Sequence, residues 1–307
     1  MFRNLLKFTS ARVALGILGF IAFLAVFGPL LAPYDPLLGT DDTLADPSAA
    51  HWLGTDYLGR DALSRILAGA PLSVLSTGQV AVIALVVGAI PGILSVYLGR
   101  AFEWLTLRLV DTLIALPFLV FAVAMTALLG NGLAQAMFAV GLLVSPLFYR
   151  VARSATLSVA NSQYVEAAIL SGASTGWVVR KHVWTKVLPP IAISLATTLG
   201  TGLVVIAALT FLGIGVQPPA PTWGGILASD LGYLTQRPYA PAFTVVLIVI
   251  TVWAFNLLAD AIRDATGESG RTITGRRAAK ANRAARLSAR DELLLTEAET
   301  ERVGALR

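Results

Sequence analysis

Six long, mostly apolar runs constrain this chain more than any other feature of its sequence. They cover residues 13–32, 72–98, 104–129, 133–148, 191–211 and 242–258. A helix crosses the roughly 30 Å hydrocarbon layer of a bilayer with about 20 apolar residues. Only 13% of the residues are charged and 56% are hydrophobic, whereas soluble domains carry about 25% charged residues. The sequence therefore predicts an all-α polytopic membrane protein with six transmembrane helices.

Prolines lie inside three of these runs, at Pro91, Pro117 and Pro146. A proline removes one backbone hydrogen bond, and a spanning helix holds it where neighbouring groups satisfy the freed carbonyl. The fourth run is short and contains Pro146, so we expect an interruption there.

The lysines and arginines predict the orientation, because cytoplasmic loops carry an excess of them. With the N-terminus inside, all of the 23 basic residues except Arg60, Arg65 and Arg237 fall on the cytoplasmic side. Both termini are therefore expected in the cytoplasm. The apolar part of the first run is longer than a signal-peptide core, so it is expected to remain as an anchor.

This topology divides the chain into segments. They are a cytoplasmic N-terminus (1–12), a first transmembrane anchor (13–32), an extracytoplasmic loop with a surface helix (33–71), a core of five transmembrane helices (72–262) that contains a cytoplasmic loop (161–190) and an outer loop (212–241), and a cytoplasmic basic tail (263–307).

The first outer loop leads into a predicted helix. Asp61 is suited to cap or begin it, and its apolar positions Leu63, Ile66 and Ala70 share a face. We expect this helix to lie along the outer membrane surface before the second span. Further along, Trp223 follows a proline-rich outer segment and is suited to the membrane interface.

The cytoplasmic loop 161–190 has the sequence of two short helices joined at a glycine. Gly172 suits the left-handed turn that closes a helix. Ser174 is suited to cap the second helix, and Pro189 is expected to end it. The small side chain of Ala167 leaves room for another surface to approach the first helix.

Four strings carry a resemblance to a known family. Glu166-Ala167-Ala168, followed by Gly172 and by Leu188-Pro189, resembles the cytoplasmic coupling loop of ABC importer permeases. The strings at 53–65, 211–224 and 254–264 resemble the dipeptide, oligopeptide and nickel branch of that family, in particular the permease with the short first outer loop.

The resemblance implies a type I ABC importer permease fold in the bacterial inner membrane. It implies a non-catalytic subunit that forms the translocation path with a second homologous permease. Two cytoplasmic ATPase subunits or domains would bind ATP and Mg, and an extracytoplasmic protein would bind the substrate. The expected ATPase-coupling residues are Glu166, Ala167, Ala168, Gly172 and His182. The residues expected on the binding-protein side are Asp56, Arg60 and Asp61.

The implied substrate is a di- or oligopeptide, with nickel or another small solute as the alternative. A stand-alone secondary transporter is the rival class, and it would need ionised or broken-helix sites at mid-depth. Asp111 is the acidic residue nearest the membrane interior, and we expect it to pair with Arg108 or to reach the cytoplasmic interface.

Several chemistries are not expected. No segment fits the Gly-x-x-x-x-Gly-Lys-Ser/Thr phosphate loop, so the chain should not hydrolyse ATP itself. The chain has no cysteine, so it has no thiolate metal site or disulfide. His51 and His182 fall on opposite sides of the membrane and cannot form one metal site. No catalytic, cofactor or metal site is expected, and the basic segments indicate topology rather than nucleic-acid binding.

The chain departs from the family pattern at two places. Thr185 stands where the coupling loop often has a proline, so the second coupling helix is expected to be straighter. The chain also continues beyond about residue 266, where the family usually ends. The basic tail is either an amphipathic helix on anionic membrane lipid or a solvated end.

Overall fold

The computed structural model describes residues 5, 6, 8–216 and 219–266, and every regular element in these ranges is a helix. Residues 2–262 form one unit, which is described below. A second unit contains residues from Arg263 onward, and only its first four residues belong to the described part. Most of the predicted basic tail, 267–307, lies outside the described residues.

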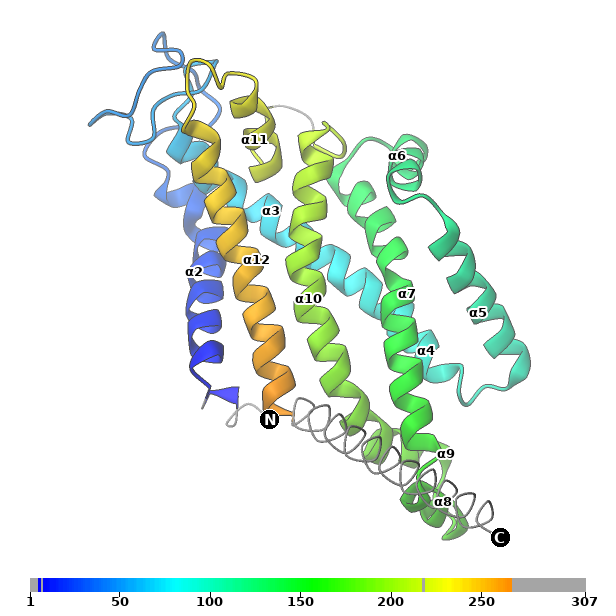
Figure 1. Cartoon of the computed structure of the whole chain (residues 1–307). Helices are drawn as coiled ribbons and strands as arrows, with labels where there is room; N and C mark the ends of the chain where they lie inside the picture. Colours follow the sequence, from blue (N-terminus) through cyan, green and yellow to red (C-terminus); the bar gives the residue numbers. More distant parts are fainter. Residues whose placement is uncertain (1–4, 7, 217–218, 267–307) are drawn as a thin grey trace, which may run out of the picture. The chain divides into compact units, whose positions relative to one another are not determined.

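Five helical runs are long and apolar enough to cross a membrane (Figure 1). They are α2 (Thr9–Leu31); the run Ala62–Leu94, made of α3 (Ala62–Ala84), the π-helical η1 (Leu85–Ala89) and α4 (Ile90–Leu94); α7 (Leu133–Ala160); the run Gly176–Phe211, most of which is α10 (Trp184–Phe211); and α12 (Ala240–Ala265). These runs coincide with five of the six predicted spans.

The remaining predicted span is a bent pair of helices. α5 (Arg100–Ala115) and α6 (Phe118–Leu129) meet at an angle of 101°. Leu116 is extended, with ψ at 131°, and it precedes Pro117, because a proline disfavours the helical conformation of the residue before it. The described residues therefore contain six candidate spans if this pair counts as one.

The prediction that Pro146 interrupts the fourth span is wrong. α7 passes through it and continues to Ala160. Pro146 cannot donate to the carbonyl of Leu142, but the hydroxyl of Ser145 donates to that same oxygen over 2.7 Å. A side-chain hydroxyl thus replaces the missing backbone donor.

The helix predicted after the first outer loop begins where expected. The carboxylate of Asp61 accepts from the backbone N–H of Ser64 over 2.8 Å and caps α3. However, α3 continues without a break through Pro71, so the predicted surface helix is the first part of the spanning run rather than a separate element. The carbonyl of Leu67, which Pro71 leaves without its helical donor, lies against the backbone of Gly28 in α2.

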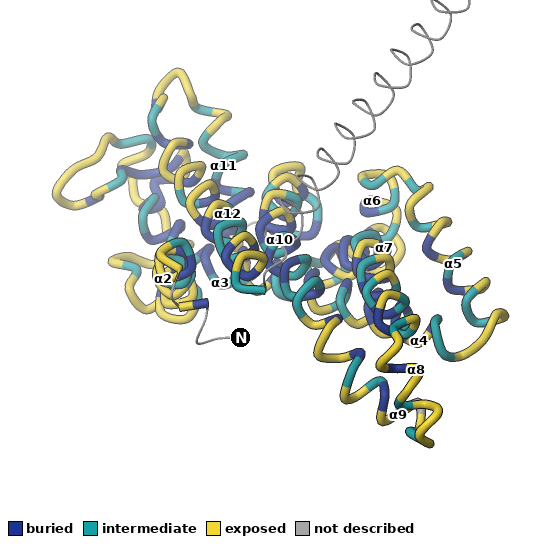
Figure 2. Tube along the Cα trace, turned by 60° about the horizontal axis from the view of Figure 1, so that its bottom comes forward, coloured by how far each residue is buried: buried dark blue, intermediate teal, exposed yellow. Residues whose placement is uncertain are grey.

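The core lies where α3, α7 and α10 meet, and Figure 2 shows the buried positions gathered along these helices. Gly88 and Gly92 allow the tightest of these approaches. A Cβ atom on Gly88 would overlap the carbonyl of Ser145, and one on Gly92 would lie 2.6 Å from the carbonyl of Tyr149. The second and fourth predicted spans thus cross with their backbones in contact, as small residues four apart permit.

Candidate functional site

Two short helices at one end of the unit form a hairpin that protrudes beyond α7 and α10 (Figure 1). They are α8 (Gln163–Leu170) and α9 (Thr175–Val178). Gly172 joins them with φ at +88°. The N–H of Ala173 donates to the carbonyl of Ala168 over 3.0 Å, and the N–H of Gly172 donates to that of Ile169 over 2.9 Å. These two bonds form a Schellman motif, which confirms the turn predicted at Gly172.

The second hairpin helix starts as predicted but does not end as predicted. The hydroxyl of Ser174 accepts from the N–H of Trp177 over 3.4 Å. α9 then passes through the π-helical η2 (Val179–Val183) into α10, and Pro189 lies inside that helix. The prediction that Pro189 ends the coupling helix is wrong: α10 contains both Pro189 and Pro190 and continues to Phe211, since the fixed φ of proline is compatible with a helix.

The predicted coupling residues occupy the exposed side of the hairpin. Glu166, Ala167 and Gly172 are exposed, and Ala168 is half-buried. A shallow hollow of about 460 Å³ lies beside them. Its lining residues are Ala168, Ser171, Gly172, Ala173, Ser174 and Trp177. The hairpin therefore offers a concave surface of five small residues and one indole, that of Trp177, with the charge of Glu166 on the same helix as Ala168.

His182 has a packing position within the hairpin. Its ring lies 5.5 Å from the ring of Tyr164 and 5.3 Å from that of Trp177, between centroids. Tyr164 belongs to α8, Trp177 to α9 and His182 to η2. The histidine thus fixes the angle between the two hairpin helices through its ring faces and edges.

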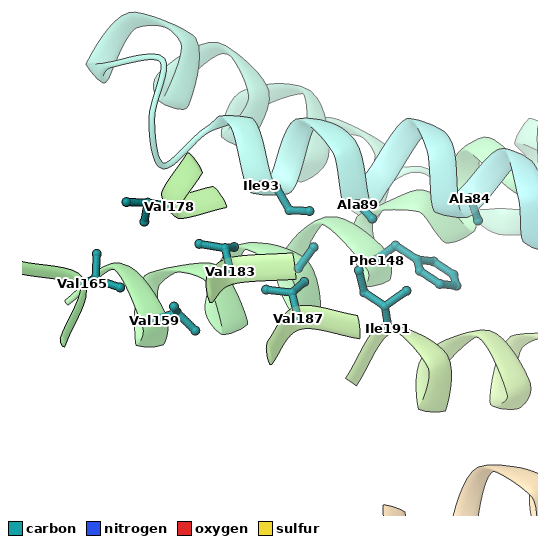
Figure 3. Close-up of a cluster of buried hydrophobic side chains, with 11 residues drawn as sticks. Ala84, Ala89, Ile93, Phe148, Val159, Val165, Val178, Val183, Val187 and Ile191 are labelled. Carbon is teal, nitrogen blue, oxygen red and sulfur yellow. The ribbon is translucent and has the colours of Figure 1, made fainter. Parts of the chain in front are cut away.

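A cluster of buried apolar side chains connects the hairpin to the helices behind it (Figure 3). Its members are Ala84, Ala89, Ile93, Phe148, Ala152, Val159, Val165, Val178, Val183, Val187 and Ile191. Val165 and Val178, one from each hairpin helix, are 2% and 1% exposed. Figure 3 shows Ala89 and Ile93 of the second spanning run facing the valines of η2 and α10. A displacement of the hairpin must therefore move three spanning runs, because close-packed side chains transmit strain.

The segment that carries the predicted binding-protein residues lies at the opposite end of the unit (Figure 1), and these residues are buried. Asp56, Arg60 and Asp61 are 6%, 5% and 3% exposed. Asp56 accepts from Nη2 of Arg60 over 2.7 Å and lies 3.4 Å from Nε of Arg65. Asp61 accepts from Ser64 and lies 2.9 Å from Nδ1 of His51. These side chains hold the outer segment in shape and are not available as a direct docking surface.

Arg237 ties the two outer loops together. It is 2% exposed, and its guanidinium donates to the backbone carbonyls of Leu53 and Thr55. Asp230 of α11 (Trp223–Leu231) lies within electrostatic reach of Arg237. Burial raises the pKa of Asp230 to about 6, and the charge of Arg237 opposes that rise. The two predicted outer loops therefore form one structure at this end of the unit.

Trp223 anchors α11 rather than facing the membrane interface. It is completely buried, its indole donates to the carbonyl of Ile66 over 3.1 Å, and its backbone N–H donates to Ser73 over 3.0 Å. The interface prediction for Trp223 is wrong because the indole N–H finds its acceptor inside the protein.

Asp111 pairs with a different arginine from the expected one. Its carboxylate lies 3.6 Å from Nη2 of Arg150 in α7, and both side chains are more than half exposed. Nearer the start of α5, the carboxylate of Glu103 accepts a hydrogen bond from Arg153 of α7 over 2.5 Å. Polar contacts of this kind hold the bent third span to α7.

Sequence reasoning missed the residues that connect these surfaces to the spans. The valines of the hairpin cluster stand in no distinctive motif. Gly88 and Gly92 do form a Gly-x-x-x-Gly pair, which indicates a close helix crossing. Arg237 entered the sequence argument only as one of three outer basic residues.

Comparison with known proteins places the chain in a family. Residues 83–267 match the family described as "Binding-protein-dependent transport system inner membrane component". Residues 1–50 match "N-terminal TM domain of oligopeptide transport permease C".

Individual relatives match over most of their length. The probable D,D-dipeptide transport system permease protein DdpC of Escherichia coli (strain K12) is 36% identical over 240 residues, which cover 78% of this chain and 80% of that protein. The dipeptide transport system permease protein DppC of Alkalihalophilus pseudofirmus is 35% identical over 266 residues, which cover 86% of this chain and 87% of that protein. The glutathione transport system permease protein GsiD of Shigella dysenteriae serotype 1 is 36% identical over 244 residues, which cover 78% of this chain and 80% of that protein.

Solved structures share the fold. Two inward-facing structures of the MetNI methionine ABC transporter align with TM-scores of 0.53 and 0.55, at 22% and 20% identity. The alignments cover 64% and 65% of this chain and 94% and 95% of those chains. With its apolar spans, the chain is a multi-pass protein of the bacterial inner membrane. The family match covers more than half of the chain, and the chain therefore belongs to the inner membrane components of binding-protein-dependent transport systems, the permease subunits of ABC importers.

Proposed function

We propose that this chain is one of two permease subunits of an ATP-driven importer for di- or oligopeptides. Relatives that are 36–37% identical over the aligned residues are named for dipeptides, di- and tripeptides, and glutathione. A second homologous permease completes the translocation path. Two ATPase subunits or domains in the cytoplasm bind ATP and Mg, and an extracytoplasmic protein delivers the substrate. This chain itself catalyses no reaction.

The hairpin of α8 and α9 is the observation that carries this proposal. Its exposed side presents Glu166 and small side chains to a partner, and its buried side shares one apolar cluster with α4, α7 and α10. ATP-driven closure of the ATPases displaces the hairpin, and the shared cluster passes this displacement to the spans. The path then switches from inward-facing to outward-facing.

Two substitutions test the coupling role. Glu166→Arg reverses the charge on the exposed side of α8, and Gly172→Val forces a β-branched residue to adopt a φ of +88°. Such strain costs about 1–3 kcal/mol, and no atom lies within 4 Å of the added Cβ, so the effect is confined to the turn. We expect both variants to lower stimulated ATPase activity and uptake in a reconstituted complex, while the binding protein keeps its affinity for substrate.

Each variant has a matched control in the same hairpin. Gln163 is exposed on α8, so Gln163→Arg adds positive charge beside Glu166 without removing its carboxylate. Gly176 also has no atom within 4 Å of an added Cβ, but its φ is not positive, so Gly176→Val adds bulk without the strain. Wild-type coupling in both Glu166→Arg and Gly172→Val would remove the hairpin from the mechanism.

The proposed orientation is tested by cysteine labelling, since the chain has no cysteine of its own. Ser48 and Ser171 are exposed at opposite ends of the unit. In intact cells whose periplasm is accessible, an impermeant thiol reagent should label Ser48→Cys at once and Ser171→Cys only after lysis. Thr55 is completely buried and is therefore unsuitable for this experiment. The reverse labelling pattern would overturn the topology.

A further inference from the structure

A cavity of about 630 Å³ opens at the outer end of the unit, between the first outer segment and α11. Its walls come from Tyr57 to Arg65, from the end of α10 and from α11 with its flanks. Binding sites for small molecules have volumes of about 300–1,000 Å³. The cavity is therefore large enough for a short peptide.

The cavity wall carries an excess of positive charge. Arg60 and Arg65 both line it, and both direct their guanidinium groups at one carboxylate, that of Asp56. Arg60 engages Asp56 through Nε and Nη2. The Nε atom of Arg65 lies 3.4 Å from the carboxylate of Asp56, and its Nη1 atom donates to the carbonyl of Pro36. The Nη2 atom of Arg65 therefore has no acceptor among the described residues.

Two ionised groups lie behind this wall, and one of them, Asp230, is also within electrostatic reach of Arg65. Asp230 and Arg237 lie there within electrostatic reach of each other and offset each other. Of the described residues that line the cavity, Arg60 and Arg65 are charged and none is acidic, so the lining itself is positive. An anionic group in the cavity would meet the free Nη2 of Arg65, and a charge-assisted hydrogen bond formed there is strong.

Two further features of the wall suit a peptide. Ser229 lines the cavity, and its hydroxyl oxygen is buried without a hydrogen-bond partner among the described residues. A buried polar atom of this kind normally has a partner. The rings of Tyr57 and Tyr233 also line the cavity and stack 5.2 Å apart at 12°. They offer an aromatic wall to apolar side chains or to the planes of peptide bonds.

We propose that this cavity binds the carboxylate end of the transported solute, with Arg65 and Ser229 as the donors and the stacked tyrosines against the body of the solute. In the proposed orientation the cavity lies on the outer side, where a solute leaves its binding protein. This inference rests on the proposed function and adds a substrate feature, a free carboxylate, that this chain itself recognises.

The experiment uses the complete importer in proteoliposomes, with binding protein in excess. Uptake is measured for trialanine with a free carboxylate and for trialanine amide, each at a concentration that saturates the binding protein. We expect Arg65→Gln to slow uptake of the free acid by about tenfold to a hundredfold, the size of one charge-assisted hydrogen bond. Uptake of the amide should change little, since it presents no carboxylate to the arginine.

A second variant leaves the ion cluster intact. Ala228→Phe fills the cavity from α11, whereas Leu231→Phe places the same side chain at an exposed position of that helix outside the cavity. We expect the first to slow uptake of both peptides and the second to leave uptake unchanged. Equal effects of Arg65→Gln on acid and amide, or wild-type uptake in Ala228→Phe, would overturn the carboxylate site. A wild-type complex that moves neither peptide would instead contradict the proposed function.

Discussion

Replacing Val178 by aspartate should abolish transport while leaving the spanning helices folded. Val178 is 1% exposed and belongs to the cluster that joins the hairpin to α4, α7 and α10. An uncompensated buried charge costs about 3–5 kcal/mol, and the hairpin can avoid this cost by leaving the cluster. Because about 1.4 kcal/mol corresponds to a tenfold change in an equilibrium, the docked hairpin should become a minor state.

The measurement is uptake and ATPase stimulation in the reconstituted complex, together with protease sensitivity of the hairpin. Val178→Ala is the matched control, because it removes two methyl groups from the same site without adding a charge. It should retain most of the coupling. If Val178→Asp retained full uptake, force would not pass through this cluster, and the link between hairpin and spans would have to be sought elsewhere.

Replacing Arg237 by alanine should release the first outer loop from the second. The buried guanidinium donates to the carbonyls of Leu53 and Thr55, and no other donor to either carbonyl is found among the described residues. Hydrogen bonds to charged groups contribute about 1.5–3 kcal/mol each, so their combined loss costs about 3–6 kcal/mol. We expect a lower melting temperature and rapid external proteolysis within residues 33–61.

Two controls separate this role from a general loss of charge. Gln236→Ala alters the exposed neighbour, whose side chain accepts a hydrogen bond from the hydroxyl of Thr235, and should behave as wild type. Arg237→Lys keeps the charge but replaces the planar fork by a single ammonium group, so an intermediate loss is expected. A wild-type melting temperature and digestion pattern for Arg237→Ala would show that the outer loops are held together by other contacts.

The mechanism proposed for the hairpin also explains why its two sides differ so strongly in composition. The exposed side carries Glu166 and small residues, which permit a close approach by a partner, together with large apolar side chains at Ile169, Leu170 and Trp177. The buried side is made of valines, whose branched side chains have few rotamers and therefore transmit displacement without repacking. The π-helical turns η1 and η2 each contribute to this cluster, through Ala89 and Val183.

The sequence by itself determined the features that depend on neighbouring residues. Hydropathy located the spans, because a bilayer selects length and apolarity rather than particular side chains. Gly172 predicted a left-handed turn, since that conformation strains other residues. Asp61 predicted a helix start, since a carboxylate can satisfy the free N–H groups there. The motifs around these residues predicted the family.

Only the tertiary structure decided which of these residues face a partner and which face the protein. Asp56, Arg60 and Asp61 have charged side chains typical of a surface, yet their partners come from within the outer segment and bury them. Arg237 reaches carbonyls of Leu53 and Thr55, far away in the chain, so no local pattern could indicate the contact. Burial depends on which helix faces meet, and hydropathy in spans that are apolar all round does not specify those faces.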